Sequence, residues 1–343
     1  MRRSLAWACG LLVLSGEALA VRGEATASSP GVGRGDAATR PGLQELRQRW
    51  GPRRARGPAS GQALPEPNFA DVHYGPHPRQ VLDLWQATSK SPSPLVLYIH
   101  GGGFVGGDKR TLLPRLLHES LQSGYSVAAI NYRLCPEVTF PTPMLDVGRA
   151  IQFLRHNAGK WNLDPKRIAS TGGSAGGGIS LWLGFHDDLA DPNSQDPIAR
   201  ESTRLTCLAV DGAQTSYDPK FAEQIGLKGL LRHPSFPLFY GLRPDEFDTP
   251  RARRLCEQAS AITHLTPDDP PVLLDYGVPD EPVDERTPLS AVVHHPRFGL
   301  ALKDRMEKLG IECIVQYPGG SGQGRVSKIE FIRKHFERVN TPK

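Results

Sequence analysis

A serine between glycines is the strongest chemical signal in this sequence of 343 residues. Residues 172–176 read Gly-Gly-Ser-Ala-Gly, and they lie between an apolar run at 167–171 and a helix-like run. The pattern predicts a strand, a tight turn and a helix, with Ser174 at the turn. In such a nucleophile elbow the glycines relieve steric crowding, and the hydroxyl is exposed above the carboxyl edge of a sheet. We therefore predict that Ser174 attacks an ester carbonyl.

A second glycine-rich segment supplies the groups that such an attack needs. His100 follows the strand-like run 94–99 and is followed by three glycines. Negative charge develops on the carbonyl oxygen during attack, and loss of one fixed N–H donor to that oxygen typically costs ~3 kcal/mol. We expect the amides of Gly102, Gly103 and Ala175 to form this oxyanion hole. His100 itself is expected to brace the glycine loop rather than to transfer protons.

With these two motifs, the chain resembles the α/β-hydrolase superfamily, specifically the hormone-sensitive-lipase-like and bacterial feruloyl-esterase-like carboxylesterases. The resemblance covers about residues 70–339 and includes further short segments at 131–134, 136–137, 140–141, 146–147 and 161–167. It implies the α/β-hydrolase fold, with a mostly parallel central sheet and helices on both faces. It also implies a serine nucleophile, an oxyanion hole and an acid–histidine pair later in the chain.

The acid of that pair is expected after the strand-like run 270–277. Asp280 stands at the position that the resemblance implies for the acid. Glu281 and Asp284 lie in the same loop and are alternatives. Each of the three is also compatible with a solvated loop charge.

The histidine that the resemblance implies is missing from the last loop. Residues 317–325 read Tyr-Pro-Gly-Gly-Ser-Gly-Gln-Gly-Arg, so Ser321 or Gln323 occupies the expected region. A serine hydroxyl is a weak nucleophile without a positioned base, and the glutamine amide has no useful basicity near neutral pH. Another histidine must therefore act as the base, or the site binds a carbonyl group without turnover.

The adjacent residues His294 and His295 are the best-placed substitutes. They lie in the connection that leaves the predicted strand at 272–276, which starts at the carboxyl edge of the sheet, as Ser174 and Asp280 do. The pair can therefore reach the nucleophile, and we take His295 as the candidate base. The alternative is that both histidines face solvent at the start of a helix. Two other histidines are poorly placed for this role: His264 and His335.

Strand-like runs alternate with helical patterns from residue 81 onward, which predicts one α/β domain over 66–343. One insertion, at about 215–260, interrupts the alternation and carries an aromatic run at 236–240. It is long enough for a small cap over the pocket. An ordinary surface excursion is the alternative.

The start of the chain predicts export. Residues 1–20 combine Arg2 and Arg3, an apolar stretch and an Ala-Leu-Ala end, as in a cleaved signal peptide. The apolar stretch is too short for a membrane span, which needs ~20 residues. Residues 21–65 predict a disordered basic linker rich in Gly, Ala, Arg and Pro. It could touch an anionic surface, but a solvated tail is the simpler interpretation.

Composition argues against other classes of function. The net charge is +5, and residues 21–58 alone carry eight arginines against three acidic residues, so the folded part is near neutral and gives no support for nucleic-acid binding. No zinc spacing or phosphate-binding fingerprint is present, so no metal or cofactor is expected. After signal cleavage four cysteines remain, and a Cys135–Cys256 disulfide is one hypothesis.

The sequence therefore predicts an exported serine hydrolase that acts on small-molecule carboxylic esters through an acyl-enzyme on Ser174. The alternative is a catalytically impaired protein of the same fold that binds a small ligand without turnover.

Overall fold

The computed structural model describes residues 64–320 and 324–339. The predicted signal peptide, nearly all of the predicted linker, and residues Ser321 and Gln323 lie outside the described residues.

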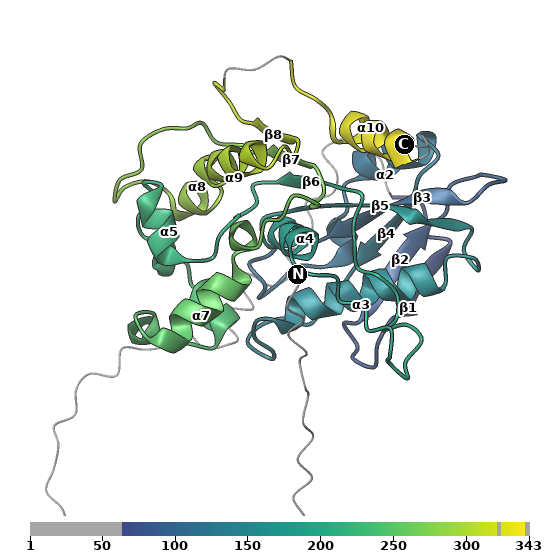
Figure 1. The fold of residues 1–343 in the computed structure, drawn as a ribbon, viewed down its shortest axis with the longest axis horizontal. Helices are drawn as coiled ribbons and strands as arrows, with labels where there is room; N and C mark the ends of the chain where they lie inside the picture. The colour runs from purple at the N-terminus through teal and green to yellow at the C-terminus, as the bar shows by residue number, and fades with distance from the viewer. Residues whose placement is uncertain (1–63, 321–323, 340–343) are drawn as a thin grey trace, which may run out of the picture. The chain divides into compact units, whose positions relative to one another are not determined.

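An eight-stranded sheet runs through the described part of the chain in the order β1-β2-β4-β3-β5-β6-β7-β8 (Figure 1). β2 pairs antiparallel with β1 and β4, and all other pairs are parallel. This confirms the predicted mostly parallel sheet. The strands are β1 (Phe69–His73), β2 (Val81–Trp85), β3 (Ser93–Ile99), β4 (Ser126–Ile130), β5 (Leu163–Gly173), β6 (Cys207–Asp211), β7 (Val272–Asp275) and β8 (Cys313–Gln316).

Helices cover both faces of the sheet because the parallel strands are apolar on both faces. In β3, Leu95 and Leu97 pack on one face and Val96 on the other. The face of Val96 is covered by α2 (Pro114–Gln122) and α10 (Lys328–Val339), which lie close together in Figure 1. The other face carries α3 (Thr142–His156), α4 (Ala175–Phe185) and α9 (Arg297–Lys308).

Helix α4 fixes the position of the serine elbow, because all of its residues are buried. Two glycines let the elbow approach the end of β3. A Cβ on Gly176 would lie 2.1 Å from the Ile99 carbonyl oxygen, and one on Gly172 would lie 2.2 Å from the same atom. Ile99 and Gly172 are also paired in the β3–β5 register. The loop after β3 and the turn after β5 are therefore side by side.

The predicted insertion at 215–260 contains short helical elements. It packs on the loop after β3 through Phe239, whose ring stacks on Phe104 with centroids 4.1 Å apart. Tyr217 contacts both rings. The elements are α5 (Pro219–Gln224), η2 (Leu230–Arg232), α6 (Ser235–Tyr240), η3 (Pro244–Glu246) and α7 (Pro250–Ala259).

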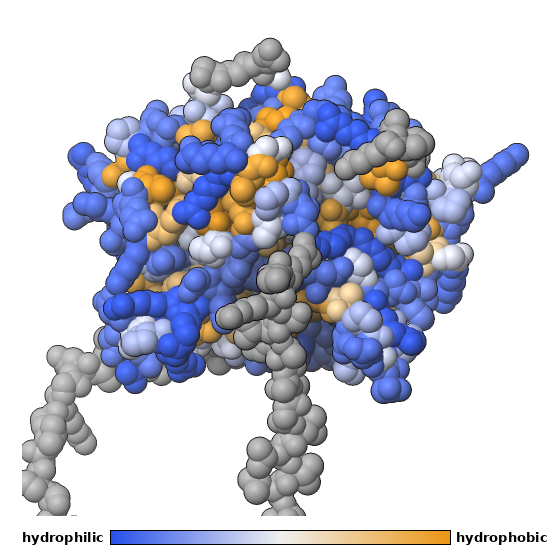
Figure 2. All heavy atoms as spheres, in the orientation of Figure 1, coloured by the Kyte–Doolittle hydropathy of each residue, from blue (hydrophilic) through white to orange (hydrophobic). Residues whose placement is uncertain are grey.

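The remaining short elements of the described chain are η1 (Lys109–Thr111), η4 (Ala261–Thr263) and α8 (Leu289–Val293). None of the described helices has both the length and the apolar character needed to cross a bilayer. Figure 2 shows hydrophilic residues over most of one face, with apolar patches between them, which is ordinary for a protein surface.

The hypothesis of a Cys135–Cys256 disulfide is wrong. Both residues are free and buried, as are the other described cysteines, Cys207 and Cys313. Burial raises the pKa of the Cys135 thiol to about 12 and that of the Cys256 thiol to about 11. Both side chains are therefore uncharged packing groups.

Candidate active site

Ser174 lies in the sharp turn between β5 and α4. Its backbone has φ 53° and ψ −121°, a region that residues other than glycine rarely occupy. Such a conformation costs of order 1–3 kcal/mol and persists only where the surroundings fix it. Here the Ser174 N–H donates to the Asp211 carbonyl oxygen at 2.9 Å, and the buried helix α4 holds the other side of the turn.

The Ser174 hydroxyl oxygen lies 2.9 Å from Nε2 of His294. His294 directly follows the short helix α8, in the connection between β7 and α9. The sequence placed the histidine pair at this edge of the sheet, and the structure brings one member of the pair to the nucleophile. That member is His294, whereas the sequence analysis favoured His295.

His295 forms its hydrogen bonds with the neighbouring loop and with the start of α9. Its Nε2 donates to the Glu281 carbonyl oxygen at 3.0 Å, and its Nδ1 accepts from the Arg297 N–H at 3.3 Å. Burial lowers the pKa of His295, so the neutral ring is favoured. With both nitrogens engaged, His295 has no free nitrogen for proton transfer.

Asp280 does not contact His294. Its Oδ1 accepts a hydrogen bond from Nε of Arg297 at 2.8 Å. Arg297 also donates to the carbonyl oxygen of Ile225 at 3.4 Å, so it joins the Asp280 loop, the start of α9 and the insertion. The structure therefore pairs Asp280 with Arg297 and does not bring it to the histidine at Ser174.

The two alternative acids are not at the histidine either. The Glu281 main chain contacts His295, and the Asp284 carboxylate accepts the N–H groups of Arg286 and Thr287 in its own loop. Among residues 64–320 and 324–339, no carboxylate forms a hydrogen bond with His294.

The polar group that acts on the pKa of His294 belongs to the main chain and not to a carboxylate. Burial lowers the pKa of His294, and a hydrogen bond with the main chain at Ser290 partly opposes this by raising it. A bond that favours the protonated ring is donated by the ring, so the Ser290 carbonyl is the acceptor. This interaction favours a ring hydrogen on Nδ1, which leaves Nε2 able to accept the proton of Ser174.

The predicted oxyanion loop lies in the same cavity as Ser174. Gly102 has φ +107° and Gly103 has φ +59°. A Cβ on Gly102 would lie 2.4 Å from the Gly106 carbonyl oxygen, so only glycine fits there. Ala175, at the start of α4, lines the cavity with both glycines.

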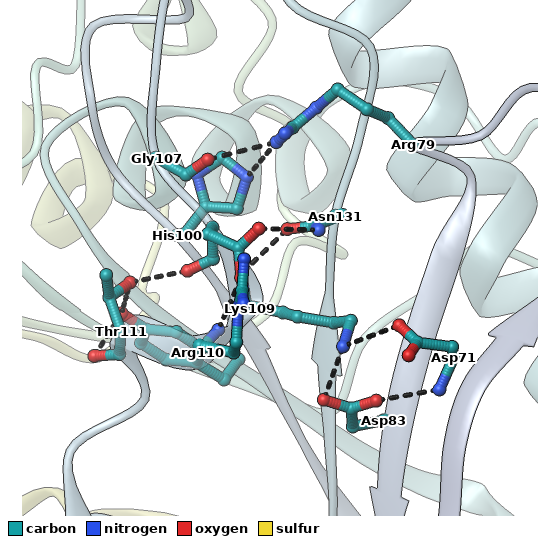
Figure 3. A network of polar contacts seen from close by, with 11 residues as sticks. Asp71, Arg79, Asp83, His100, Gly107, Lys109, Arg110, Thr111 and Asn131 are labelled. Carbon is teal, nitrogen blue, oxygen red and sulfur yellow. Dashed lines mark hydrogen bonds and ion pairs between the residues drawn. The ribbon is translucent and has the colours of Figure 1, made fainter. Parts of the chain in front are cut away.

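A buried network holds this loop from behind (Figure 3). His100 Nδ1 donates to the Gly101 carbonyl oxygen at 2.7 Å, and its Nε2 accepts from Arg79 Nη2 at 3.2 Å. Arg79 also donates to the Gly107 carbonyl oxygen at 3.0 Å, which joins the two ends of the loop. Burial lowers the pKa of His100 to about 4, so it is neutral and structural, as its predicted bracing role requires.

The far end of the loop is anchored by a buried cation. Lys109 Nζ lies 2.6 Å from an Asp83 carboxylate oxygen and 2.9 Å from one of Asp71 (Figure 3). The Lys109 N–H donates to Asn131 Oδ1 at 2.7 Å. Removing one partner of a buried ion pair is costly, so this anchor keeps the loop in one position.

The cavity at Ser174 has a volume of about 690 Å³, which suits a small organic molecule. Aromatic and aliphatic side chains form most of its wall. The residues that line it are Gly102, Gly103, Phe104, Ser174, Ala175, Gln214, Tyr217, Arg232, His233, Pro234, Ser235, Phe236, Phe239, Leu289, Ser290, Val293 and His294. In the described ranges, no group of three or more His, Cys, Asp or Glu residues is arranged to hold a metal ion.

Comparison with known proteins agrees with this geometry. The sequence profile of the BD-FAE family matches residues 82–222. A truncated carbohydrate esterase from gut microbiota aligns over 79% of this chain and 95% of its own, with a TM-score of 0.60 and 20% identity. The chain has the α/β-hydrolase fold. An acetyl ester-xyloside bifunctional hydrolase from Caldicellulosiruptor lactoaceticus has the same fold, with a TM-score of 0.55 and 24% identity over 76% of this chain and 85% of its own.

The esterase LipQ of Mycobacterium tuberculosis (strain ATCC 25618 / H37Rv) is similar in sequence to this chain. The two are 28% identical over 244 residues, which is 68% of this chain and 52% of LipQ. The chain spans about half the length of the first curated relatives that it matches.

Three polar groups in the cavity were not among the predicted site residues. Arg232, His233 and Ser235 come from the insertion and line the wall. Their segment has no sequence motif, and the aromatic run beside them was its only signal.

We expect His294→Ala to lower kcat by about 10²–10⁴-fold, because it removes the group that accepts the Ser174 proton. His295→Ala is the matched control, since it removes an adjacent imidazole that does not contact Ser174. The kcat of His295→Ala should stay within about tenfold of the wild-type value. Its free energy of unfolding should fall by about 1–3 kcal/mol, because the Glu281 carbonyl loses its hydrogen-bond donor. Steady-state kinetics and urea unfolding measure the two effects. Equal losses of kcat in both variants would contradict the assignment of His294.

The pH dependence of kcat/KM should report the lowered pKa of His294. The ring must be neutral to accept a proton, so activity rises with pH through its pKa. Because burial places this pKa below the usual value of about 6.5, the acid limb should have its midpoint below pH 6.5. A limb centred clearly above 6.5 would indicate a carboxylate beside the ring, contrary to the geometry.

Proposed function

We propose that this α/β-hydrolase is a carboxylesterase that uses Ser174 and His294 as a catalytic dyad. The distance of 2.9 Å between Ser174 Oγ and His294 Nε2, in a cavity that also contains the oxyanion loop, carries the proposal. The names of the similar proteins support ester hydrolysis, since LipQ is an esterase and the gut protein a carbohydrate esterase.

In the first half of the reaction, Ser174 Oγ attacks the ester carbonyl carbon while its proton passes to His294 Nε2. The carbonyl oxygen becomes an oxyanion, and the N–H groups of Gly102, Gly103 and Ala175 stabilise it. When the tetrahedral intermediate collapses, the C–O bond to the alcohol breaks. His294 gives its proton to that oxygen, and the acyl group remains on Ser174.

In the second half, water takes the place of the alcohol. His294 accepts a proton from the water as its oxygen attacks the acyl carbon, and the same amides hold the second oxyanion. Collapse breaks the bond to Ser174, whose oxygen takes the proton back from His294. The products are the carboxylic acid and the alcohol, and the dyad returns to its starting protonation state.

In this mechanism the Ser290 carbonyl fixes the tautomer of the histidine, which is one of the two functions of the aspartate in a triad. A triad carboxylate fixes the tautomer of the histidine and stabilises the imidazolium, and its replacement by an amide lowers kcat by about 10⁴-fold largely through the wrong tautomer. A carbonyl that accepts from the ring supports the correct tautomer. It stabilises the imidazolium less than a full negative charge does, so we propose a slower enzyme than one with a carboxylate.

Hydrolysis of a short-chain 4-nitrophenyl ester by the purified full-length chain tests the proposal. We expect turnover that Ser174→Ala lowers by at least about 10³-fold, because it removes the nucleophile. A fluorophosphonate probe should label the wild type and fail to label Ser174→Ala. The alternative, binding without turnover, predicts no hydrolysis and no labelling, and that result would exclude the esterase.

We propose in addition that the enzyme acts outside the cytoplasm. Arg2 and Arg3, the apolar stretch and the Ala-Leu-Ala end at 18–20 support this. When the full chain is produced in a bacterium, the protein recovered from the periplasm or medium should begin at Val21, as measured by intact mass. A cytoplasmic protein that keeps residues 1–20 would contradict export.

A further inference from the structure

We propose that Arg232 makes this site select esters that carry a free carboxylate in addition to the ester group. The inference rests on the proposed esterase function and names its substrate class. Its basis is the charge pattern of the cavity, the position of the Arg232 guanidinium and the absence of a competing anion.

The charge pattern of the cavity is one-sided. Arg232 is the only Lys or Arg among the described residues that line it, and no Asp or Glu lines it. His233, beside Arg232, is mostly buried, which lowers its pKa to about 4, so it adds no charge near neutral pH. A cavity with one fixed cation and no fixed anion attracts negatively charged molecules.

Arg232 forms no ion pair with a described carboxylate. The hydrogen bond that the structure gives its guanidinium runs from Nη1 to the Glu285 carbonyl oxygen at 3.5 Å, the outer limit for such a bond. Arginines of the neighbouring loops differ, because Arg243, Arg286 and Arg297 each pair with an aspartate. Arg232 therefore keeps most of its N–H donors available toward the cavity and solvent.

The backbone around Arg232 leaves space for the guanidinium. Gly229 has φ +84°, and a Cβ there would lie 2.4 Å from Arg232 Nε and 2.9 Å from its Cζ. The guanidinium thus lies against the main chain of Gly229, in space that any other side chain would occupy. This contact limits the positions of a long side chain and lowers the entropy lost when it binds an anion.

The position of Arg232 relative to the dyad fits a substrate that spans the cavity. Arg232 ends η2, and η2 packs against α8. Helix α8 contributes Leu289, Ser290 and Val293 to the wall and is followed directly by His294. A substrate with its ester carbonyl at Ser174 can therefore place a carboxylate at Arg232, with its hydrocarbon part along the apolar wall.

A carboxylate is the anion that this arrangement fits best. A guanidinium offers two parallel N–H donors that match the two oxygens of a planar carboxylate. The apolar wall favours a hydrocarbon spacer between the carboxylate and the ester. Half-esters of dicarboxylic acids and esters of hydroxybenzoic acids have this composition.

Two substrate pairs test the proposal, one for each side of the ester. Mono-4-nitrophenyl adipate and 4-nitrophenyl hexanoate differ by a carboxylate on the acyl side. 4-Acetoxybenzoate and its methyl ester differ by a carboxylate on the alcohol side. Each rate is corrected for uncatalysed hydrolysis. We expect the wild type to prefer the charged member of at least one pair, less strongly at 0.5 M than at 0.05 M NaCl.

Arg232→Gln should lower kcat/KM for that preferred charged ester by about tenfold to hundredfold, the range expected for losing hydrogen bonds to a charged group. Its kcat/KM for the neutral partner should fall much less, so that the ratio of kcat/KM for the charged ester to that for the neutral ester falls by at least about fivefold. Arg232→Lys keeps the charge without the two parallel donors and should restore part of the preference.

Arg251→Gln is the matched control. Arg251 is exposed on α7 and does not line the cavity. The same loss of charge there should leave the ratio of kcat/KM for the charged ester to kcat/KM for the neutral ester unchanged in both substrate pairs.

Equal effects of Arg232→Gln on both members of both pairs would overturn the proposal. A wild-type enzyme that does not prefer the charged ester of either pair would also overturn the proposal. The proposed function would still stand in that case if the neutral esters are hydrolysed in a Ser174-dependent way. Binding to Ser174→Ala, measured by calorimetry, examines Arg232 without turnover. Mono-4-nitrophenyl adipate or 4-acetoxybenzoate, whichever is preferred, should bind Ser174→Ala at least tenfold more tightly than the Ser174→Ala/Arg232→Gln double variant. Equal binding would refute the role of Arg232 independently of any result on catalysis.

Discussion

The close approach of the serine elbow to the end of β3 is the constraint on which the site depends. The Ile99 carbonyl oxygen lies where a Cβ of Gly172 or Gly176 would be, so no side chain fits at either position. This contact places the turn after β5 against the loop after β3, so Ser174 and the proposed oxyanion donors lie side by side. The unusual backbone of Ser174 is tolerated because the fully buried helix α4 holds it there.

The proposed base lies in a different connection from the one that the resemblance implied, and the topology explains why this is possible. In a parallel sheet every connection that follows a strand starts at the same carboxyl edge, so the loops after β7 and β8 both leave the sheet at the edge that carries the serine. Here the segment after β8 is held by ion pairs with carboxylates at that edge, Arg325 with Asp275 and Lys328 with Asp211. The connection after β7 supplies His294 instead.

Local patterns predicted the elbow, the oxyanion loop and the sheet, since each depends on a short run of glycines or apolar residues. The choice between His294 and His295 did not follow from such a pattern. Consecutive residues in a helical turn point about 100° apart, and α8, with five residues, is too short for its sequence to fix that direction. Asp280 was predicted from its position after the strand, where the resemblance implies the acid, and the structure pairs it with Arg297. Arg232 lies in a segment without a motif, so only the cavity reveals it.

The missing carboxylate and the free cation of the cavity belong to one electrostatic arrangement. A carboxylate beside His294 would stabilise the imidazolium, but it would also repel an anionic substrate from a cavity that no described acidic residue lines. If Arg232 binds a substrate carboxylate, the substrate brings a negative charge into the cavity at the moment when His294 becomes positive. Two opposite unit charges about 8 Å apart attract each other by ~2 kcal/mol at an effective dielectric constant of about 20, and the positive charge of Arg232 offsets part of such an attraction. Charged esters would then gain in kcat as well as in KM, because the imidazolium exists only along the reaction path.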